Sequence, residues 1–122
     1  MIDHVGYEVG DLAVSGRFYD AVFFAIGVRR LHENADVVGW GVTEPVFWIT
    51  ARHAPAPGYG HIALRAAGKA AVDAAHAAGL QGGGSDDGLP GPRPRYGPRY
   101  YAAYLRDPDG LRVEIVASHT GA

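Results

Sequence analysis

Three residues of types that bind metal ions stand at related places in the chain. His4 lies in the segment DHVGYE (residues 3–8), and His61 lies in the similar segment GHIALR (residues 60–65). Each histidine is followed by alternating small, apolar and polar residues, the pattern of a half-buried strand. If the two strands occupy equivalent places in paired units, the imidazoles form a pair, and Glu114 is the candidate for a third ligand.

Glu114 stands between Val113 and Ile115 in a strand-like run. An ionised carboxylate among apolar residues is costly unless a cation or hydrogen-bond donors meet it. Two histidines and a divalent ion would meet that need. Such a set also leaves coordination positions open for water or substrate, as a catalytic metal requires. The residues therefore predict a metal site of His4, His61 and Glu114.

These residues also have a plainer interpretation. A lone histidine is commonly half-buried and hydrogen-bonded to backbone. Glu114 can instead form a solvated ion pair with Arg65, Arg106 or Arg112. Both interpretations stay open from the residues alone. The other four histidines fall on an edge strand, a linker, a helix and a terminus, where surface roles are expected. They are His32, His53, His76 and His119.

A second group of residues suited to ligand binding combines four tyrosines with three arginines. They are Tyr96, Tyr100, Tyr101, Tyr104, Arg93, Arg95 and Arg99. Around one cavity, such rings and guanidinium groups would hold an aromatic or anionic ligand. The same residues are equally consistent with loop packing and solvated charges.

Composition limits the function classes. The chain of 122 residues, 48% of them hydrophobic, fits one globular domain. Its net charge of −2 provides no basic field to hold nucleic acid. There is no cysteine, so a metal would be held by imidazole and carboxylate. The N-terminus lacks a signal core, and no apolar run approaches the roughly 20 residues that span a bilayer. We expect a cytoplasmic protein that does not bind membranes.

Periodicity predicts the elements that position these residues. Residues 2–9 alternate as a strand, and a helix with its N-cap at Asp11 and its stop at Gly27 would cover the apolar face of that strand. Three strand-like runs complete a βαβββ unit: 28–33, 37–42 and 46–51.

A proline-rich link over residues 54–58 leads to a second unit, which repeats the first strand. An alanine-rich helix over 69–78 follows, with Gly79 as its end. Residues 81–98 are rich in glycine and proline and predict a long loop, typical of a lid or binding loop. A hairpin over 99–117, turning at Asp107-Pro108-Asp109-Gly110, ends the unit.

With these motifs the chain resembles the vicinal oxygen chelate superfamily, which includes glyoxalase I, extradiol dioxygenases, fosfomycin-modifying enzymes and bleomycin-binding resistance proteins. The resemblance covers essentially the whole chain. Its carriers are DHV at residues 3–5, the stretch from 9 to 19, GHI at 60–62 and RDPDGLRVE at 106–114.

The resemblance implies an α+β fold of two βαβββ modules in a single domain. Module one would span residues 1–53 and module two residues 59–122, with 54–58 as the linker. The modules would form a curved mixed sheet or half-barrel with the helices outside. Members of the superfamily commonly pair, and a sheet has edges to cover, so we expect a homodimer.

The resemblance carries metal ligands over to His4, His61 and Glu114, for a divalent ion such as iron, manganese, nickel or zinc. Trp48 stands where glyoxalase-like members carry a second carboxylate, and tryptophan cannot ligate a metal. The ion would chelate two substrate oxygens and stabilise an oxyanion or enolate, in a lyase, isomerase, thiol transferase or dioxygenase type of reaction.

Proton transfer in such an enzyme would fall to Glu8 or a loop tyrosine, with Tyr101 as the candidate. The alternative function is a metal-free protein that sequesters an aromatic small molecule or antibiotic in the same cavity. In either case the partner is a small molecule.

Overall fold

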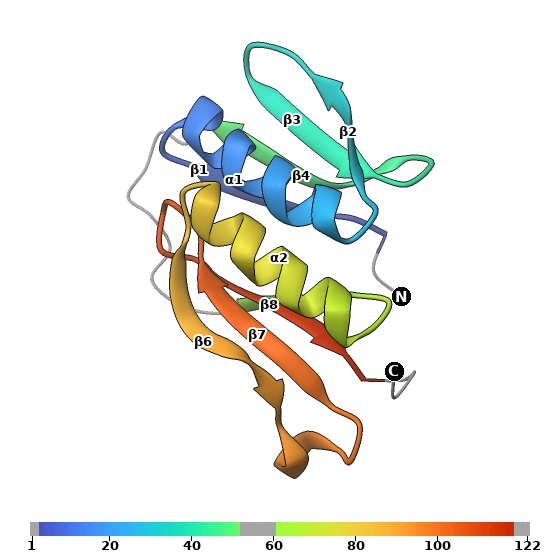
Figure 1. The fold of residues 1–122 in the computed structure, drawn as a ribbon. Coiled ribbons are helices and arrows are strands. Elements are labelled where there is room, and N and C mark those ends of the chain that lie inside the picture. The colour runs from blue at the N-terminus through green and yellow to red at the C-terminus, as the bar shows by residue number, and fades with distance from the viewer. Residues whose placement is uncertain (1–2, 52–60, 119–122) are drawn as a thin grey trace.

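Two units with the same order of elements make up the fold (Figure 1). The computed structural model describes residues 3–51 of module one and residues 61–118 of module two, with only the backbone of His61. Module one consists of β1 (Val5–Val9), α1 (Leu12–Ala25), β2 (Arg29–Glu33), β3 (Val37–Gly41) and β4 (Pro45–Ala51). Module two consists of β5 (His61–Arg65), α2 (Lys69–Gln81), β6 (Ser85–Pro92), the 3₁₀ helix η1 (Pro94–Tyr96), β7 (Tyr101–Arg106) and β8 (Arg112–Ala117).

Each module builds one four-stranded mixed sheet. The strand order is β1-β4-β3-β2 in module one and β5-β8-β7-β6 in module two. In each sheet the first strand of the module runs parallel to the last, and the other pairs are antiparallel. The two described sheets are open and form no closed barrel. The predicted α+β class and the βαβββ repeat are confirmed.

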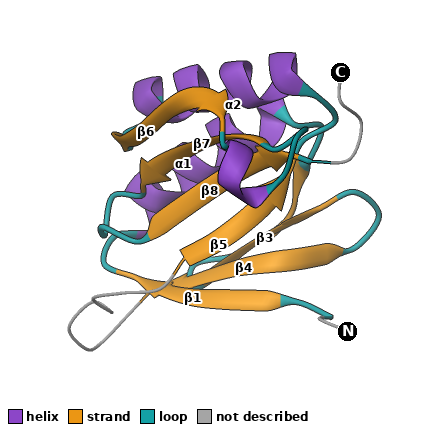
Figure 2. Cartoon of the chain, turned by 90° about the horizontal axis from the view of Figure 1, so that it is seen from below, coloured by secondary structure: helices purple, strands orange, loops and turns teal. Residues whose placement is uncertain are grey.

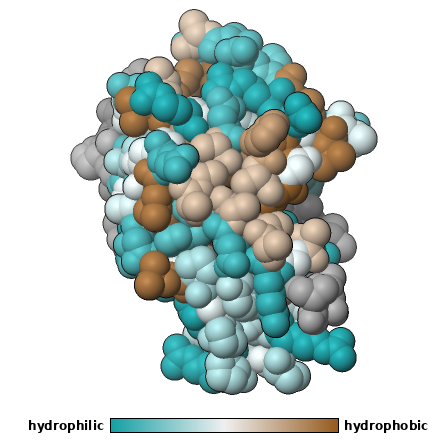
Figure 3. Space-filling view, viewed as in Figure 1, coloured by the Kyte–Doolittle hydropathy of each residue, from teal (hydrophilic) through white to brown (hydrophobic). Residues whose placement is uncertain are grey.

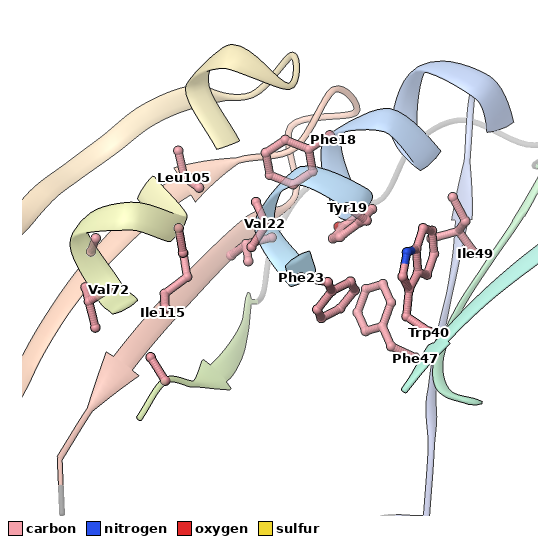
Figure 4. Close-up of a cluster of buried hydrophobic side chains, with 14 of the residues drawn as sticks. Phe18, Tyr19, Val22, Phe23, Trp40, Phe47, Ile49, Val72, Leu105 and Ile115 are labelled. Carbon is pink, nitrogen blue, oxygen red and sulfur yellow. The ribbon is translucent and has the colours of Figure 1, made fainter. Parts of the chain in front are cut away.

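The helices lie on one side of both sheets (Figure 2) and pack against each other. Apolar residues that alternate along the strands meet the helices in one core (Figure 4). The buried side chains labelled there are Phe18, Tyr19, Val22, Phe23, Trp40, Phe47, Ile49, Val72, Leu105 and Ile115. The opposite face of each sheet, called the open face, carries the intervening residues, which include Trp48 and Glu114.

Helix α1 begins and ends where the sequence predicts. The Asp11 side chain accepts a hydrogen bond from the Val14 amide at 3.0 Å, which satisfies one of the unpaired donors of the first turn. After the C-cap at Ile26, Gly27 has a φ of +85°. That left-handed conformation favours glycine and stops the helix.

The turn between β7 and β8 ties module two to module one. The Asp109 carboxylate accepts hydrogen bonds from the Gly10 amide at 3.0 and 3.1 Å and from the Ser15 hydroxyl at 3.3 Å. The Tyr19 hydroxyl donates to Asp107 at 2.8 Å, and burial raises the pKa of that carboxyl. The Asp-Pro-Asp-Gly motif therefore positions the two modules and lies away from Glu114 on the hairpin.

The predicted loop over residues 81–98 is wrong, because residues 85–92 form β6 and residues 94–96 form η1. This strand pairs with β7, with register shifts between Asp86 and Gly88 and between Gly88 and Gly91. Prolines are tolerated since β6 is an edge strand whose outward amides need no partner. Pairing with a neighbouring strand outweighs a weak local propensity for strand.

The predicted end of the second helix at Gly79 is also wrong. Helix α2 continues to Gln81, and Gly79 is buried inside it. A Cβ at Gly79 would lie 2.5 Å from Leu105 Cδ1 and 3.0 Å from Val22 Cγ2. Close packing of α2 against α1 and β7 therefore explains this glycine.

The expectation of a surface position is wrong for His76, which is 4% exposed. Its Nε2 lies 2.8 Å from Asp86 Oδ1, because α2 packs on β6. His32 is exposed on the edge strand β2, as expected. His53, His119 and the linker lie outside the described residues. Neither described helix is long and apolar enough to cross a membrane.

Candidate functional site

Glu114 lies near the middle of β8 and is 3% exposed. Its neighbours Val113 and Ile115 pack into the core below the helices, so Glu114 faces the other way, onto the open face of module two. The Tyr100 hydroxyl donates a hydrogen bond to its carboxylate. A cavity of about 200 Å³ adjoins this pair, and the residues around it are Tyr96, Tyr100, Tyr104, Arg112 and Glu114.

The phenols beside Glu114 keep their protons at neutral pH. Burial raises the pKa of Tyr100 far above its ordinary value, and the hydrogen bond to Glu114 raises it further. Burial and then the charge of Glu114 also raise the pKa of Tyr104. Tyr100 is therefore a donor that orients the carboxylate, and it is poorly suited to accept a proton.

His4 lies just before β1, and its side chain is 60% exposed. Its Nδ1 lies 2.8 Å from Asp3 Oδ1, a contact that orients the imidazole. His4 also lines a cavity of about 380 Å³, which residues of β1, β3, β4 and β5 form together with the end of α1. Phe23 and Ile62 are among the apolar residues of that cavity.

The two histidines occupy equivalent backbone positions. Gly6 of β1 is in register with Trp48 of β4, and Ala63 of β5 is in register with Glu114 of β8. His4 precedes Gly6 by two residues, and His61 precedes Ala63 by two. The His61 backbone is itself in register with Arg112. The side chain of His61 lies outside the described part of the structure.

Two imidazoles and a carboxylate have the donor chemistry that divalent transition metals accept. The Glu114 carboxylate faces one cavity and the exposed His4 imidazole lines another, and the two cavities share no described lining residue. The donor types suit a metal, but the described structure does not bring these two side chains together. Among the described side chains, without that of His61, no three histidine, aspartate or glutamate residues form a group that could hold a metal.

The Glyoxalase/Bleomycin resistance protein/Dioxygenase superfamily model matches residues 1–115. The chain belongs to this family. It is 33% identical to a glyoxalase/bleomycin resistance protein from Albidiferax ferrireducens, with a TM-score of 0.84 over 93% of this chain and 96% of that one. A comparison with curated protein sequences found no match.

Two more distant solved structures share the fold. A fosfomycin resistance protein from Mesorhizobium loti is 20% identical, with a TM-score of 0.73 over 98% of this chain and 93% of that one. A lactoylglutathione lyase from Agrobacterium tumefaciens is 22% identical, with a TM-score of 0.65 over 95% of this chain and 92% of that one.

In this family member Trp48 occupies the place in module one that Glu114 occupies in module two. The Trp48 ring lies on Gly39, where an added Cβ would be 2.6 Å from Trp48 Cζ3. Its ring centroid is 5.5 Å from that of His32. The open face of module one thus carries an aromatic ring at the position where the resemblance implied a second carboxylate in other members.

Of the two predicted proton-transfer residues, Tyr101 faces away from Glu114. The Tyr101 hydroxyl donates to Asp73 of α2 at 2.6 Å, on the face of β7 opposite Tyr104. Glu8 is exposed on β1, on the same strand face as Gly6. The structure brings Tyr100 to Glu114 in place of Tyr101. Strand alternation contained this signal, since Tyr100 and Tyr104 have the same parity in the sequence.

A larger cavity of about 490 Å³ adjoins the one at Glu114. The two share Tyr96, Tyr104 and Arg112. Most of the predicted group of tyrosines and arginines lies around these two cavities, whereas Arg99 and Tyr101 line a separate one. Arg112 is a lining residue that sequence reasoning considered only as a partner for Glu114.

Proposed function

We propose that this family member is a small enzyme that depends on a divalent metal ion held by His4, His61 and Glu114. The observation that carries the proposal is the carboxylate of Glu114. It is buried between Val113 and Ile115, faces a cavity, and is oriented by a hydrogen bond from Tyr100. A fixed carboxylate with an adjoining cavity suits a site that must hold an ion and admit a ligand.

The metal would supply Lewis-acid chemistry to two neighbouring substrate oxygens, which favours an oxyanion or enolate. Glu114 would contribute the negative charge of the ligand set, and Tyr100 would keep its carboxylate in one orientation. Lyase, isomerase, thiol transferase and dioxygenase types all use such a chelated oxyanion, so the proposal covers these reaction types. A fosfomycin resistance protein and a lactoylglutathione lyase share this fold.

Proton transfer in this proposal is assigned to Glu8, which is exposed on the same strand as Gly6. Tyr101 receives no step, since its hydroxyl is bonded to Asp73 beside α2. Glu8→Gln should therefore lower turnover and leave metal affinity unchanged. Turnover that does not respond to this substitution would remove Glu8 from the mechanism.

Metal analysis tests the proposal directly. Protein purified without added metal should contain a divalent ion, and metal-stripped protein should bind manganese, iron(II), nickel or zinc in calorimetry. Removal of the metal should abolish turnover of a substrate, and addition of the ion that binds in calorimetry should restore turnover. Failure of all four ions to bind would reject the metalloenzyme.

The second candidate function is a metal-free protein that sequesters a small molecule. One observation favours it specifically: Trp48 replaces a carboxylate at the equivalent position, which reduces the number of anionic ligands. In that case purified protein would contain no metal, and an aromatic compound would bind with the same affinity before and after chelator treatment.

We also propose that the protein is a cytoplasmic homodimer that does not bind nucleic acid. Each sheet ends in two edge strands, β1 and β2 in module one and β5 and β6 in module two, and uncovered edges favour association. Sedimentation at micromolar concentration should report twice the chain mass. A monomer of 12.9 kDa would contradict this.

A further inference from the structure

The 490 Å³ cavity of module two is rich in arginine. It lies between β6, η1 and the strands β7 and β8, and its charged lining residues are Arg93, Arg95, Arg112 and Asp87. The end of the molecule that carries η1 has a hydrophilic surface (Figure 3). A volume of this size accommodates an ordinary small-molecule ligand.

The single aspartate of this cavity is already shared by two arginines. Asp87 Oδ2 accepts a hydrogen bond from Arg112 Nε at 2.8 Å and lies 3.2 Å from Arg106 Nε. Arg93 and Arg95 form no ion pair with any residue in 3–51 or 61–118. The cavity therefore carries an excess of positive charge, which attracts anions.

Arg93 is fixed before any ligand arrives. Its Nη2 donates to the Leu89 carbonyl at 2.8 Å, and its Nη1 lies 3.3 Å from the Pro92 carbonyl. The Arg93 amide also donates to the Tyr100 carbonyl at 2.8 Å, which closes the η1 segment onto the start of β7. A guanidinium has five N–H donors, so these contacts leave others available for a carboxylate or phosphate.

Tyr104 connects the arginines to the site at Glu114. The guanidinium carbons of Arg112 and Arg93 lie 4.1 and 5.6 Å from the centre of its ring. On β8, Glu114 is the direct partner of Tyr104. Because the two cavities share Tyr96, Tyr104 and Arg112, one ligand can occupy both.

We infer that the ligand of this protein is a small organic anion whose carboxylate or phosphate group binds to Arg93, Arg95 and Arg112, while the rest of the molecule extends past Tyr104 toward Glu114. The inference rests on the proposed function in one respect only, that the open face of module two is the ligand site. Arginine is suited to this recognition because its planar fork matches the oxygens of carboxylate and phosphate.

Titrations of metal-free protein followed by NMR test the inference with three probes: benzoate, phenyl phosphate and the neutral benzyl alcohol. The two anions should bind roughly tenfold or more tightly than benzyl alcohol, as expected for hydrogen bonds to charged groups. A difference between benzoate and phenyl phosphate identifies the acid that the site prefers. Equal binding of all three probes, or no binding of either anion, overturns the inference.

The double variant Arg93→Gln/Arg95→Gln should weaken anion binding by roughly tenfold or more. Arg17→Gln is the matched control, since Arg17 is exposed on α1. Circular dichroism and thermal unfolding should confirm that both variants fold. Undiminished binding of anions by the folded double variant would overturn the inference.

Metal titrations of the same proteins separate the two hypotheses. The double variant should keep the manganese affinity of the wild type, whereas Glu114→Gln should lose manganese and still bind the anion. Anion binding without metal binding rejects the metalloenzyme and keeps the anion site. Metal binding with no preference for anions rejects the anion site and keeps the metalloenzyme.

Discussion

On the open face of module one, Trp48 stands on β4 where module two has Glu114 on β8. The backbone registers that define this equivalence are the same in both sheets. Trp48 is half-buried and contacts the ring of His32, whereas Glu114 accepts a hydrogen bond from Tyr100 beside a cavity. One repeated backbone therefore supports an aromatic surface in one module and a polar site in the other.

The glycines explain how the same backbone allows both arrangements. In module one the Trp48 ring lies on Gly39 of the neighbouring strand β3. In module two the ring belongs to Tyr104 of β7 and lies on Gly88 of β6, where an added Cβ would be 2.8 Å from Tyr104 Cδ2. Compared with module one, the ring and its glycine in module two lie one strand closer to the β6 edge of the sheet. The position on β8 that corresponds to Trp48 is therefore open for a carboxylate beside a cavity.

The largest expected effect follows from replacing the carboxylate of module two. Glu114→Gln removes the anionic ligand and should weaken divalent metal binding by more than about 100-fold. This loss exceeds the one expected when a residue that only contacts a metal ligand is replaced. His4→Ala and His61→Ala should also weaken it strongly. Calorimetry with manganese, iron(II), nickel and zinc measures these affinities.

Glu44→Gln is the matched control for this prediction, because Glu44 is exposed in the turn before β4. Its metal affinity should equal that of the wild type, and so should that of His119→Ala. His76→Ala is a poor control because His76 is buried. Metal binding that survives in a folded Glu114→Gln variant would show that Glu114 does not bind the metal. The open faces of the two modules would then not differ in metal binding.

The next effect concerns the aromatic face of module one. Gly39→Ala should cost roughly 1–3 kcal/mol of unfolding free energy, because the new methyl group displaces the Trp48 ring. Gly6→Ala lies on the same face, but its Cβ would be 4.0 Å from Trp48 Cβ, which is ordinary contact. Denaturant unfolding should find a smaller cost there. In a Trp48→Ala background the Gly39→Ala cost should fall, and a cost that persists would refute the steric explanation.

A smaller effect distinguishes two neighbouring tyrosines. Tyr100→Phe removes the hydroxyl that orients Glu114 and should weaken metal binding by roughly tenfold. This is the smaller end of the loss expected when a residue that hydrogen-bonds to a metal ligand is replaced. Tyr101→Phe removes a hydroxyl bonded to Asp73 on the opposite face of β7 and should leave metal affinity unchanged. Equal effects of the two substitutions in calorimetry would show that Tyr100 does not act through Glu114.

Each module also joins its helix to its edge strand through a polar contact, with different groups. In module one, Asp20 of α1 accepts hydrogen bonds from Arg30 of β2 at 2.7 and 2.9 Å and from the Trp40 indole at 2.9 Å. In module two, His76 of α2 contacts Asp86 of β6 at 2.8 Å. In the contact of module two, the pKa of the Asp86 carboxyl is lowered from its ordinary value.

The smallest predicted effect is a pH dependence at this contact. The hydrogen bond from His76, together with one from the Gly88 amide, lowers the pKa of Asp86 from its ordinary value of 3.8. Since the folded-state pKa is lower than the unfolded one, Asp86 stabilises the fold above pH 3.8, and this contribution is lost as the pH falls through 3.8 and below. Asp86→Asn should therefore lose less stability than the wild type during acid titration. Asp36→Asn, in an exposed turn, should follow the wild type in the same unfolding series.

Much of the fold was predictable because its signals are local. Alternation of apolar and polar residues identified β1, which begins directly after His4, and β8, which carries Glu114. Asp11 and Gly27 marked the ends of α1. The Asp-Pro-Asp-Gly turn set the hairpin that carries Glu114. These features depend on residues a few positions apart, whose propensities and caps act within one element.

The sequence by itself determined the βαβββ order of module one and which side of each predicted strand is apolar. Only the tertiary structure decided that residues 85–92 form an edge strand, that His76 is buried, and that Tyr100 reaches Glu114 while Tyr101 faces α2. It also brought Arg112 to the arginines of the β6 and η1 region. These outcomes depend on pairing and packing between segments far apart in the chain, and such contacts outweigh local propensity.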